Sequence, residues 1–308
     1  MTYVTRTGVS AAAGSSGGTA EANDGLAVPP RPVPGADRPA GATRGKRQHS
    51  LLGIRTSLDH RWRILLGALG VICIFGLWTL AAYQLHTGSA LVPTPVDTWK
   101  ALAKMWSAGT LQKDMVASVQ RVAIGYSISM VIGIVLGLAI GSFASFEAFL
   151  EPQIGFLRYI PATALTPLFL LWLGIDESPK IWLIVAGTVF YNILMVADVV
   201  RNVPRELLNA SYTLGAGRLT VLRKVILPHS WPGIIDVARI NLAAAWLMLV
   251  VAELLAAQRG LAFEIIRAQR FRAVDTMFAL LIVFGVIGLV SDLTLRWVRR
   301  RVAPWARA

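Results

Sequence analysis

The sequence predicts an all-α membrane protein with six transmembrane helices, and three observations lead to that prediction. Hydrophobic residues make up 55% of the 308 residues, charged residues only 15%, and the mean hydropathy is +0.58. Several stretches of about 20 residues carry no charge, which is enough for a helix to cross a bilayer. The basic residues behind the net charge of +13 concentrate between those stretches. That distribution orients a membrane protein and differs from the basic face of a nucleic-acid-binding domain.

The few residues suited to metal binding or catalysis exclude other classes of protein. Cys73 is the single cysteine, so a disulfide within the chain is impossible. The four histidines are not spaced like metal ligands. The chain has no Gly-x-x-x-x-Gly-Lys-Ser/Thr phosphate loop and no readable nucleophile–base pair. We therefore predict no catalytic, cofactor-binding or metal-ligating residue.

Two regions of different composition divide the chain. Residues 1–50 are rich in Ala, Gly, Ser and Pro and cannot form a hydrophobic core. They have neither the apolar core of a signal peptide nor a twin-arginine pair. We expect a disordered cytoplasmic tail over 1–50 and a membrane domain over 51–308.

The apolar stretches define the six expected spans. The third is interrupted by Pro152, Pro161 and Pro167, so we expect a broken helix there. The spans are 64–83, 116–143, 149–172, 181–200, 234–257 and 277–297.

The loops between these spans differ in basic residues. Segment 1–63, loop 201–232 and the tail from residue 296 hold nine, five and five Lys or Arg. The loops on the other side hold three, one and four. The positive-inside rule then places both termini and the 201–232 loop in the cytoplasm of a multi-pass plasma-membrane protein.

Two local patterns predict helix packing and a surface helix. Small residues recur every fourth position in the second span, at Gly125, Ser129, Gly133, Gly137 and Gly141. This ridge predicts close approach of another helix, whose identity the sequence leaves open. Segment 94–107, with Thr94 as its cap and Trp99 and Trp106 on one face, predicts an interfacial helix.

The loop between spans four and five (about 201–230) predicts two short helices. Pro204 suits a first helical turn, and Gly215 and Gly217 permit a sharp turn after it. A second helix follows, and we expect Pro228 and Pro232 to stop it before span five. Such an element either transmits force to a soluble partner or lies on the bilayer surface, and the physical pattern favours neither.

This loop resembles the EAA loop in permease subunits of binding-protein-dependent ABC importers. The motif has Glu-Ala-Ala, a glycine a few residues later and an Ile-x-Leu-Pro ending. The chain has Asn209-Ala210-Ser211, then Gly215, then Ile226-Leu227-Pro228, with Glu206 one turn before Asn209.

Further matches extend the resemblance over roughly residues 75 to 305 and point to the nitrate/sulfonate/taurine branch. They are Pro93-x-Pro95, Ser118-x-x-Arg121-x-x-x-Gly125, Ile160-Pro161-x-x-Ala164-x-x-Pro167, Leu173-Gly174-Ile175 with Lys180, Ala245-Trp246, Ala252-Glu253 and Pro304-Trp305. The chain departs from the branch at Gly260-Leu261-Ala262, where a second glycine is usual.

The resemblance implies an importer that moves a small solute by alternating access. It implies a homodimer of this chain, an ABC ATPase subunit that binds ATP and Mg, and an extracytoplasmic solute-binding protein. Nucleic acid is not an expected partner, and the lipid bilayer is. The implied ATPase-coupling residues are Glu206, Asn209, Ala210, Ser211, Gly215, Ile226, Leu227 and Pro228.

Polar side chains within spans are the candidates for the translocation pathway or gate, because they are costly in lipid. The candidates are Arg158, Tyr159, Asn192, Trp246 and Glu253. For Glu253 a structural salt bridge is an equally good interpretation, and for Arg158 a contact with lipid headgroups is another. For Asp198 and Asp292 we expect either an interfacial position or pairing with nearby arginines.

The second functional hypothesis is an ion-coupled secondary transporter or channel without an ATPase. In that case Glu253, Asp198 and Asp292 would be its ion or proton sites. A membrane-embedded enzyme is a third class, without a catalytic cluster to support it. Nitrate, sulfonates, taurine, bicarbonate and a pyrimidine-type precursor all remain possible substrates.

Overall fold

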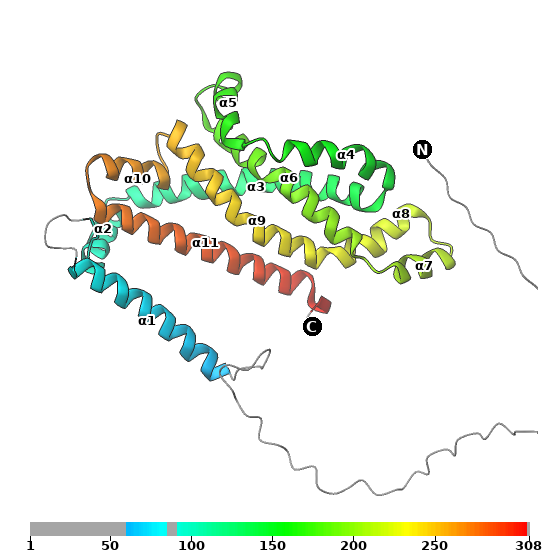
Figure 1. Cartoon of the computed structure of the whole chain (residues 1–308), viewed down its shortest axis with the longest axis horizontal. Helices are drawn as coiled ribbons and strands as arrows, with labels where there is room; N and C mark the ends of the chain where they lie inside the picture. The colour runs from blue at the N-terminus through cyan, green and yellow to red at the C-terminus, as the bar shows by residue number, and fades with distance from the viewer. Residues whose placement is uncertain (1–59, 85–90, 307–308) are drawn as a thin grey trace, which may run out of the picture. The chain divides into compact units, whose positions relative to one another are not determined.

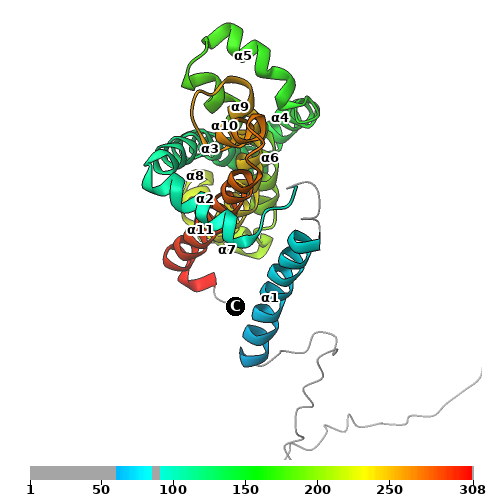
Figure 2. The same cartoon turned by 90° about the vertical axis from the view of Figure 1, so that its left-hand side faces the viewer.

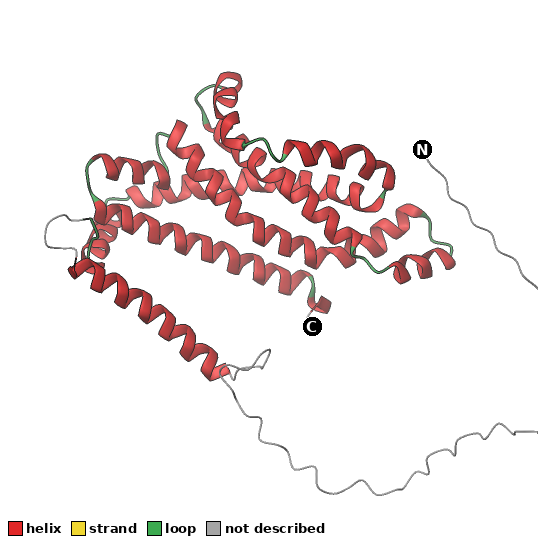
Figure 3. Ribbon diagram, in the orientation of Figure 1, coloured by secondary structure: helices red, strands yellow, loops and turns green. Residues whose placement is uncertain are grey.

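Helices form nearly all of the regular structure in the computed structural model, which describes residues 60–84 and 91–306. No strand occurs in this part of the chain (Figure 3), so the all-α prediction is confirmed there. The helices are α1 (His60–Gln84), α2 (Pro95–Ser107), α3 (Thr110–Ser142), α4 (Ala144–Leu157), α5 (Thr166–Leu173), α6 (Glu177–Arg201), α7 (Arg205–Thr213), α8 (Arg218–Val221), α9 (Leu227–Ala256), α10 (Leu261–Arg270) and α11 (Val274–Val302).

Contacts divide the chain after Arg63, and the fold described below belongs to the unit from Ile64 onward. The tail expected over 1–50 lies outside the described residues. Five helices of the described ranges are long and apolar enough to cross a membrane, and the bent pair α4–α5 makes a sixth if counted as one span. Each predicted span therefore corresponds to a helix or to this pair, although α3 and α9 begin several residues earlier than predicted.

The broken third span is confirmed, but Pro152 does not interrupt it. The two halves meet at 81°, and the break lies between Arg158 and Pro161. Pro161 disfavours a helical conformation at Ile160, which explains where α4 ends. Pro152 lies inside α4, on an exposed face where the helix accommodates the missing hydrogen bond.

The expected stop at Pro228 and Pro232 is wrong, because α8 continues into α9. A π turn over Leu222–Ile226 joins them, in which the Leu227 N–H donates to the Leu222 carbonyl. Proline has no N–H and crowds the carbonyl four residues earlier, and the wider π turn relieves both problems at Pro228. The second coupling helix is therefore the first part of the helix that forms span five.

The helix that packs on the small-residue ridge of α3 is α6. A Cβ built on Gly137 would lie 2.7 Å from Val196 Cβ, and one on Gly141 would lie 2.6 Å from Val200 Cβ. The same holds at Gly133, where Asn192 Cβ would be 2.8 Å away. The predicted ridge is confirmed, and it meets an equally regular row of every fourth residue on α6.

Helix α9 completes the centre of the bundle beside α3 and α6 (Figures 1 and 2). The ends of α3 and α6 and the start of α9 lie beside α7 and α8, and we call this the α7 end. The starts of α3 and α6 and the last turn of α9 lie beside α10, at the α10 end. Helix α11 runs along α9 and packs against α2 and α10.

The surface helix expected over 94–107 is α2. The Asp97 N–H donates to Thr94 Oγ1 over 3.2 Å, so Thr94 caps the helix as predicted. Trp99 and Trp106 are both exposed, which suits indole rings at the depth of lipid headgroups.

Replacing Gly137 with alanine tests the α3–α6 seam. The added Cβ would lie only 2.8 Å from the Ile193 carbonyl oxygen, so the helices must separate. We expect the apparent Tm in detergent to fall by roughly 2–12 °C. Gly285→Ala on α11 is the control, since no atom lies within 4 Å of its added Cβ. Equal shifts for both variants would contradict the seam.

Candidate functional site

The segment between α6 and α9 begins with α7, as the EAA resemblance implies. Pro204 precedes the helix with φ −56°, and Glu206 lies in its first turn. Gly215 ends it with φ +80°, and the Ala216 N–H donates to the Ser211 carbonyl over 3.0 Å. This left-handed glycine is the hinge predicted from the sequence. After Gly217 the chain enters α8.

The predicted coupling residues fall into two groups. Glu206, Asn209, Ala210 and Gly215 are exposed on α7 and its turn, and Ser211 is half-buried with its hydroxyl donating to the Leu207 carbonyl. The second group joins α8 to α9. It consists of Ile226, which is buried, Leu227, which is half-buried, and Pro228, which is exposed. The segment thus has an accessible part and a part anchored in the bundle.

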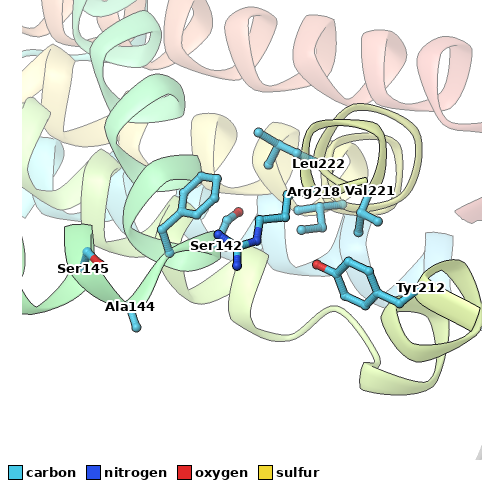
Figure 4. Close-up of a pocket in the computed structure, with 9 residues that line it drawn as sticks. Ser142, Ala144, Ser145, Tyr212, Arg218, Val221 and Leu222 are labelled. Atoms are coloured by element: carbon cyan, nitrogen blue, oxygen red, sulfur yellow. The ribbon is translucent and has the colours of Figure 1, made fainter. Parts of the chain in front are cut away.

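Two adjoining hollows lie beside α7, where it faces the corner between α3 and α4. The first, of about 280 Å³, is lined by Ser142, Phe143, Ala144, Ser145, Tyr212, Arg218, Val221, Leu222 and Ile226. In Figure 4 the Tyr212 hydroxyl and the Arg218 guanidinium point toward this corner. The second hollow, of about 410 Å³, shares Tyr212 and Ile226 and adds Arg205, Arg201 and Glu147. We call both together the α7 hollows.

A buried ion pair lies at the α10 end. Glu253 is 0% exposed and Arg121 is 3% exposed. Arg121 Nη1 donates to Glu253 Oε1 over 2.7 Å, and the Ser118 hydroxyl donates to the same oxygen over 2.6 Å. The Ala262 N–H donates to Oε2 over 2.8 Å. The structural salt bridge considered for Glu253 is therefore present, and the residue lies inside the bundle.

Arg121 also links this pair to α6. Its Nε and Nη2 donate to the two carboxylate oxygens of Glu177 over 2.5 and 2.9 Å. Lys180 Nζ lies 3.0 Å from Glu177 Oε1, and the Arg259 carbonyl accepts from Arg121 Nη1. One guanidinium thus connects α3, α6, α9 and the loop before α10.

The same cluster holds the loop between α9 and α10. Asp114 accepts the Gly260 N–H over 2.9 Å, and Ser118 accepts the Leu261 N–H over 2.9 Å. Gly260 has φ +135°, and a Cβ there would lie 2.4 Å from a Glu253 carboxylate oxygen. Glycine is required at this position. Ala262, which stands where the branch usually has glycine, joins the cluster through its backbone N–H, a contact that any residue except proline can make.

Asn192 lies at the centre of the bundle in a network of hydrogen bonds. Its amide donates to Ser129 Oγ over 2.8 Å, and Asn241 of α9 donates to its carbonyl oxygen over 2.8 Å. Thr188 also donates to Ser129. Such contacts hold helices together in lipid, where no hydrophobic effect drives helices to associate.

Of the other pathway candidates, Arg158 and Tyr159 contact each other, and Trp246 lies on another helix. At the break after α4, Arg158 donates to the Tyr159 hydroxyl over 3.1 Å and stacks over its ring. Trp246 of α9 is half-buried and packs edge-on against Phe284 of α11. The structure does not bring these residues together into one site within the chain, and their roles in the pathway stay predictions.

Of the two expectations for Asp198 and Asp292, pairing with arginines is confirmed. Asp198 lies 3.0 Å from Arg201, which also pairs with Glu147 and Glu151 of α4. Asp292 of α11 pairs with Arg239 of α9 and with Arg296, each over 2.8 Å.

Sequence reasoning missed the polar face of α3 at the α10 end. Asp114, Ser118 and Arg121 recur at helical spacing ahead of the small-residue ridge and are all buried. Polar residues at this spacing in an otherwise apolar helix are the sequence signal that could have predicted this buried polar face. Ser118 and Arg121 entered only as part of a family motif, with no role attached.

Replacing Arg121 or Glu253 singly tests which of the two residues is more costly to leave without its partner. Arg121→Gln leaves the Glu253 carboxylate buried without a cation, so we expect an apparent Tm lower by roughly 6–20 °C. Glu253→Gln costs less, because Arg121 keeps Glu177 as a partner. The double variant should unfold at a higher temperature than Arg121→Gln alone. Arg296→Gln, which removes an exposed pair, is the control. A larger loss for Glu253→Gln than for Arg121→Gln would contradict the analysis.

Comparisons with known proteins agree on one family. The family described as "Binding-protein-dependent transport system inner membrane component" matches residues 129–304, more than half of the chain. The taurine transport system permease protein of Escherichia coli (strain K12) is 34% identical over 82% of this chain and 92% of its own length. A putative aliphatic sulfonates transport permease protein of Bacillus subtilis (strain 168) is 32% identical over 75% and 84%.

A solved structure shows the same fold. A chain of the MetNI methionine ABC transporter, in an inward-facing conformation, is 20% identical, with a TM-score of 0.57 over 64% of this chain and 97% of that chain. The family match and the sequence relatives agree with the multi-pass helical bundle. This chain therefore belongs to the family of binding-protein-dependent transport system inner membrane components, the permease subunits of ABC transporters.

Proposed function

We propose that the chain is the permease subunit of an importer for a small anion such as nitrate, a sulfonate or taurine. One observation carries the mechanism: the α7–α8 segment is continuous with span five through the π turn. A displacement of α7 and α8 therefore moves α9, which holds Asn241 in the central network and Glu253 in the buried pair. This coupling supports alternating access driven from the α7 end.

The proposed partners follow from the family. ATP hydrolysis takes place in a separate ATPase subunit, so the chain itself is not an enzyme. That subunit binds ATP and Mg and contacts the chain at the α7 end. Two copies of the chain form the membrane part, and an extracytoplasmic binding protein delivers the solute. The termini and α7 lie in the cytoplasm, as the distribution of basic residues supports.

Relatives support an anionic substrate. The related permeases are named for transport of taurine, aliphatic sulfonates and bicarbonate. Each of these solutes carries a negatively charged oxygen group. A sulfonate, nitrate or similar oxyanion is therefore the substrate class that we propose.

The three carboxylates that a proton-coupled carrier would use are all engaged. Glu253, Asp198 and Asp292 each form an ion pair with an arginine. This arrangement supports the ATP-driven mechanism over the ion-coupled one.

Reconstitution tests the proposal. Liposomes that contain the chain, its ATPase and its binding protein should accumulate radiolabelled taurine or sulfonate only when ATP is present on the ATPase side. Uptake driven by a proton gradient, by the chain without an ATPase, would overturn it.

The hinge glycine allows a finer test. A valine at Gly215 must adopt φ +80°, whereas a valine at Gly217 keeps φ −72°, and both positions have open space around the added Cβ. Left-handed strain costs about 1–2 kcal/mol, so we expect Gly215→Val to lower ATP-driven uptake roughly five- to thirtyfold. Gly217→Val is the matched control and should keep most activity. Equal losses for the two variants would show that the turn conformation is not required.

A further inference from the structure

The break in the third span lies at mid-depth in the bundle. A Cβ built on Gly187 would lie 3.5 Å from Ala162 Cβ, so the break rests against Gly187. Gly187 is near the middle of α6, roughly 15 Å from the start of that helix. The hydrocarbon core of a bilayer is about 30 Å thick, so the break lies close to its centre. In Figure 1 α5 turns away from the direction of α4 at this point.

The backbone at this break is neither fully helical nor covered. The chain is non-helical from Arg158 to Pro161, and a 3-10 turn follows over Ala162–Leu165. The exposed residues of the break are Tyr159, Ile160, Pro161, Thr163 and Ala164. Lipid cannot form hydrogen bonds with irregular backbone, so such backbone occurs at this depth only where it is buried in protein or faces water. The described part of this chain does not bury it, and a water-filled pathway is the surroundings that it suits.

Arg158 lies at this break without a carboxylate partner. The residue is half-buried, and its Nε atom is buried with no hydrogen-bond partner in the described part of the chain. Its Nη2 donates to the Tyr159 hydroxyl, and its guanidinium lies 5.0 Å from the centre of the Tyr159 ring. Arg121 and Arg239, which also lie inside spans, each pair with two carboxylates.

Depth distinguishes Arg158 from other arginines that lack an ion pair. Arg259, Arg270 and Arg272 form none within the described ranges either, but they lie at the α10 end, outside the apolar spans. Water and salt screen a charge there. A guanidinium at mid-depth is costly unless water or an anion compensates its charge. The position of Arg158 therefore favours an anion that enters from outside the chain.

We propose that the break of the third span lines the translocation pathway, and that Arg158 and Tyr159 bind the transported oxyanion there. The inference rests on the proposed function and names the place where the membrane subunit holds the substrate. A guanidinium fork pairs with two oxygens of a sulfonate or nitrate at once. The Tyr159 hydroxyl accepts a bond from Arg158, so its own proton remains available for a third oxygen. Stacking on the ring orients the guanidinium.

A phospholipid headgroup offers the same chemistry, because its phosphate is also an oxyanion. From the centre of the bilayer a headgroup is roughly 15 Å away, which is farther than an arginine side chain reaches. This distance favours a solute in the pathway over a lipid phosphate. A second copy of the chain is the other group that could cover the break, and it would exclude water from it.

Cysteine labelling tests whether the break faces water and attracts anions. Thr163→Cys is introduced into the full-length Cys73→Ser chain, since Cys73 is the single cysteine, and the chain is placed in liposomes with its ATPase. It should react with water-soluble methanethiosulfonate reagents, whereas Leu289→Cys, on an exposed apolar face of α11, should not. Relative to a free thiol, a sulfonate-bearing reagent should be favoured over a cationic one. Arg158→Gln should lower this preference roughly threefold or more.

ATP-driven uptake tests the role of the two residues in transport. At saturating loaded binding protein, Arg158→Gln should lower the rate of radiolabelled sulfonate uptake about tenfold or more, and Tyr159→Phe about two- to tenfold. Arg158→Lys should retain part of the rate, because it keeps the charge. Stimulated ATP hydrolysis and the apparent Tm should stay close to wild type in all three variants, which a merely structural role would not allow.

Arg301→Gln is the matched control. Arg301 also lies over an aromatic ring, 5.1 Å from the centre of Trp297, but at the exposed end of α11. Its replacement removes the same charge and the same kind of stacking, and uptake should remain at the wild-type rate. An equal loss of uptake in Arg301→Gln and Arg158→Gln would overturn the inference.

The remaining outcomes separate the inference from the proposed function. Equal uptake by wild type and Arg158→Gln would overturn only the inference. No reaction at Thr163→Cys would show that lipid or a second copy covers the break, with the same consequence. A preference for the sulfonate reagent in detergent that disappears in liposomes would assign Arg158 to a lipid phosphate and again overturn the inference. If wild type with its ATPase and binding protein takes up no oxyanion, the proposed function is overturned, and the inference falls with it whatever the labelling shows.

Discussion

The close approach of α3 and α6 is the constraint on which the rest of the bundle depends. Their seam is so tight that alanine does not fit at Gly137 or Gly141 without displacing α6. Because lipid does not drive helices together, such packing and the hydrogen bonds that it permits must hold them. At this spacing Ser129 reaches Asn192 in the middle of the seam, and Arg121 reaches Glu177 at its end. The buried pair with Glu253 then fixes α9 to both helices.

The helices of this fold could be predicted from the sequence more accurately than the breaks and connections between them. Uninterrupted apolar stretches are governed by bilayer thickness, so the spans were predictable, as were the Thr94 cap and the Gly215 turn. Prolines were misjudged because their effect depends on context: Pro161 breaks a helix, Pro152 lies within one, and a π turn accommodates Pro228. The partner of the α3 ridge could not be predicted, because several spans are apolar enough to pack there.

The candidate functional residues could likewise be predicted where they lie close together in the sequence, but not where the fold brings distant residues together. The α7 residues were found through a local motif, and their exposure agrees with a contact surface. The cluster around Arg121 was not found, because its members come from α3, α6, α9 and the loop before α10, and only the fold brings them together. Arg121 thus pairs with Glu177 and Glu253 inside the bundle, an arrangement that composition alone cannot express.

The π turn before Pro228 has a geometric consequence for α8. It contains one more residue than an α-helical turn, and each residue of a helix advances the side-chain direction by about 100°. The faces of α8 are therefore rotated by that angle from where an unbroken helix would place them. Arg218 points toward the corner of α3 and α4 because of the backbone at Leu222–Ile226, several residues away. Deleting a single residue there would turn the whole of α8, and every partner contact it makes, to a different side of the molecule.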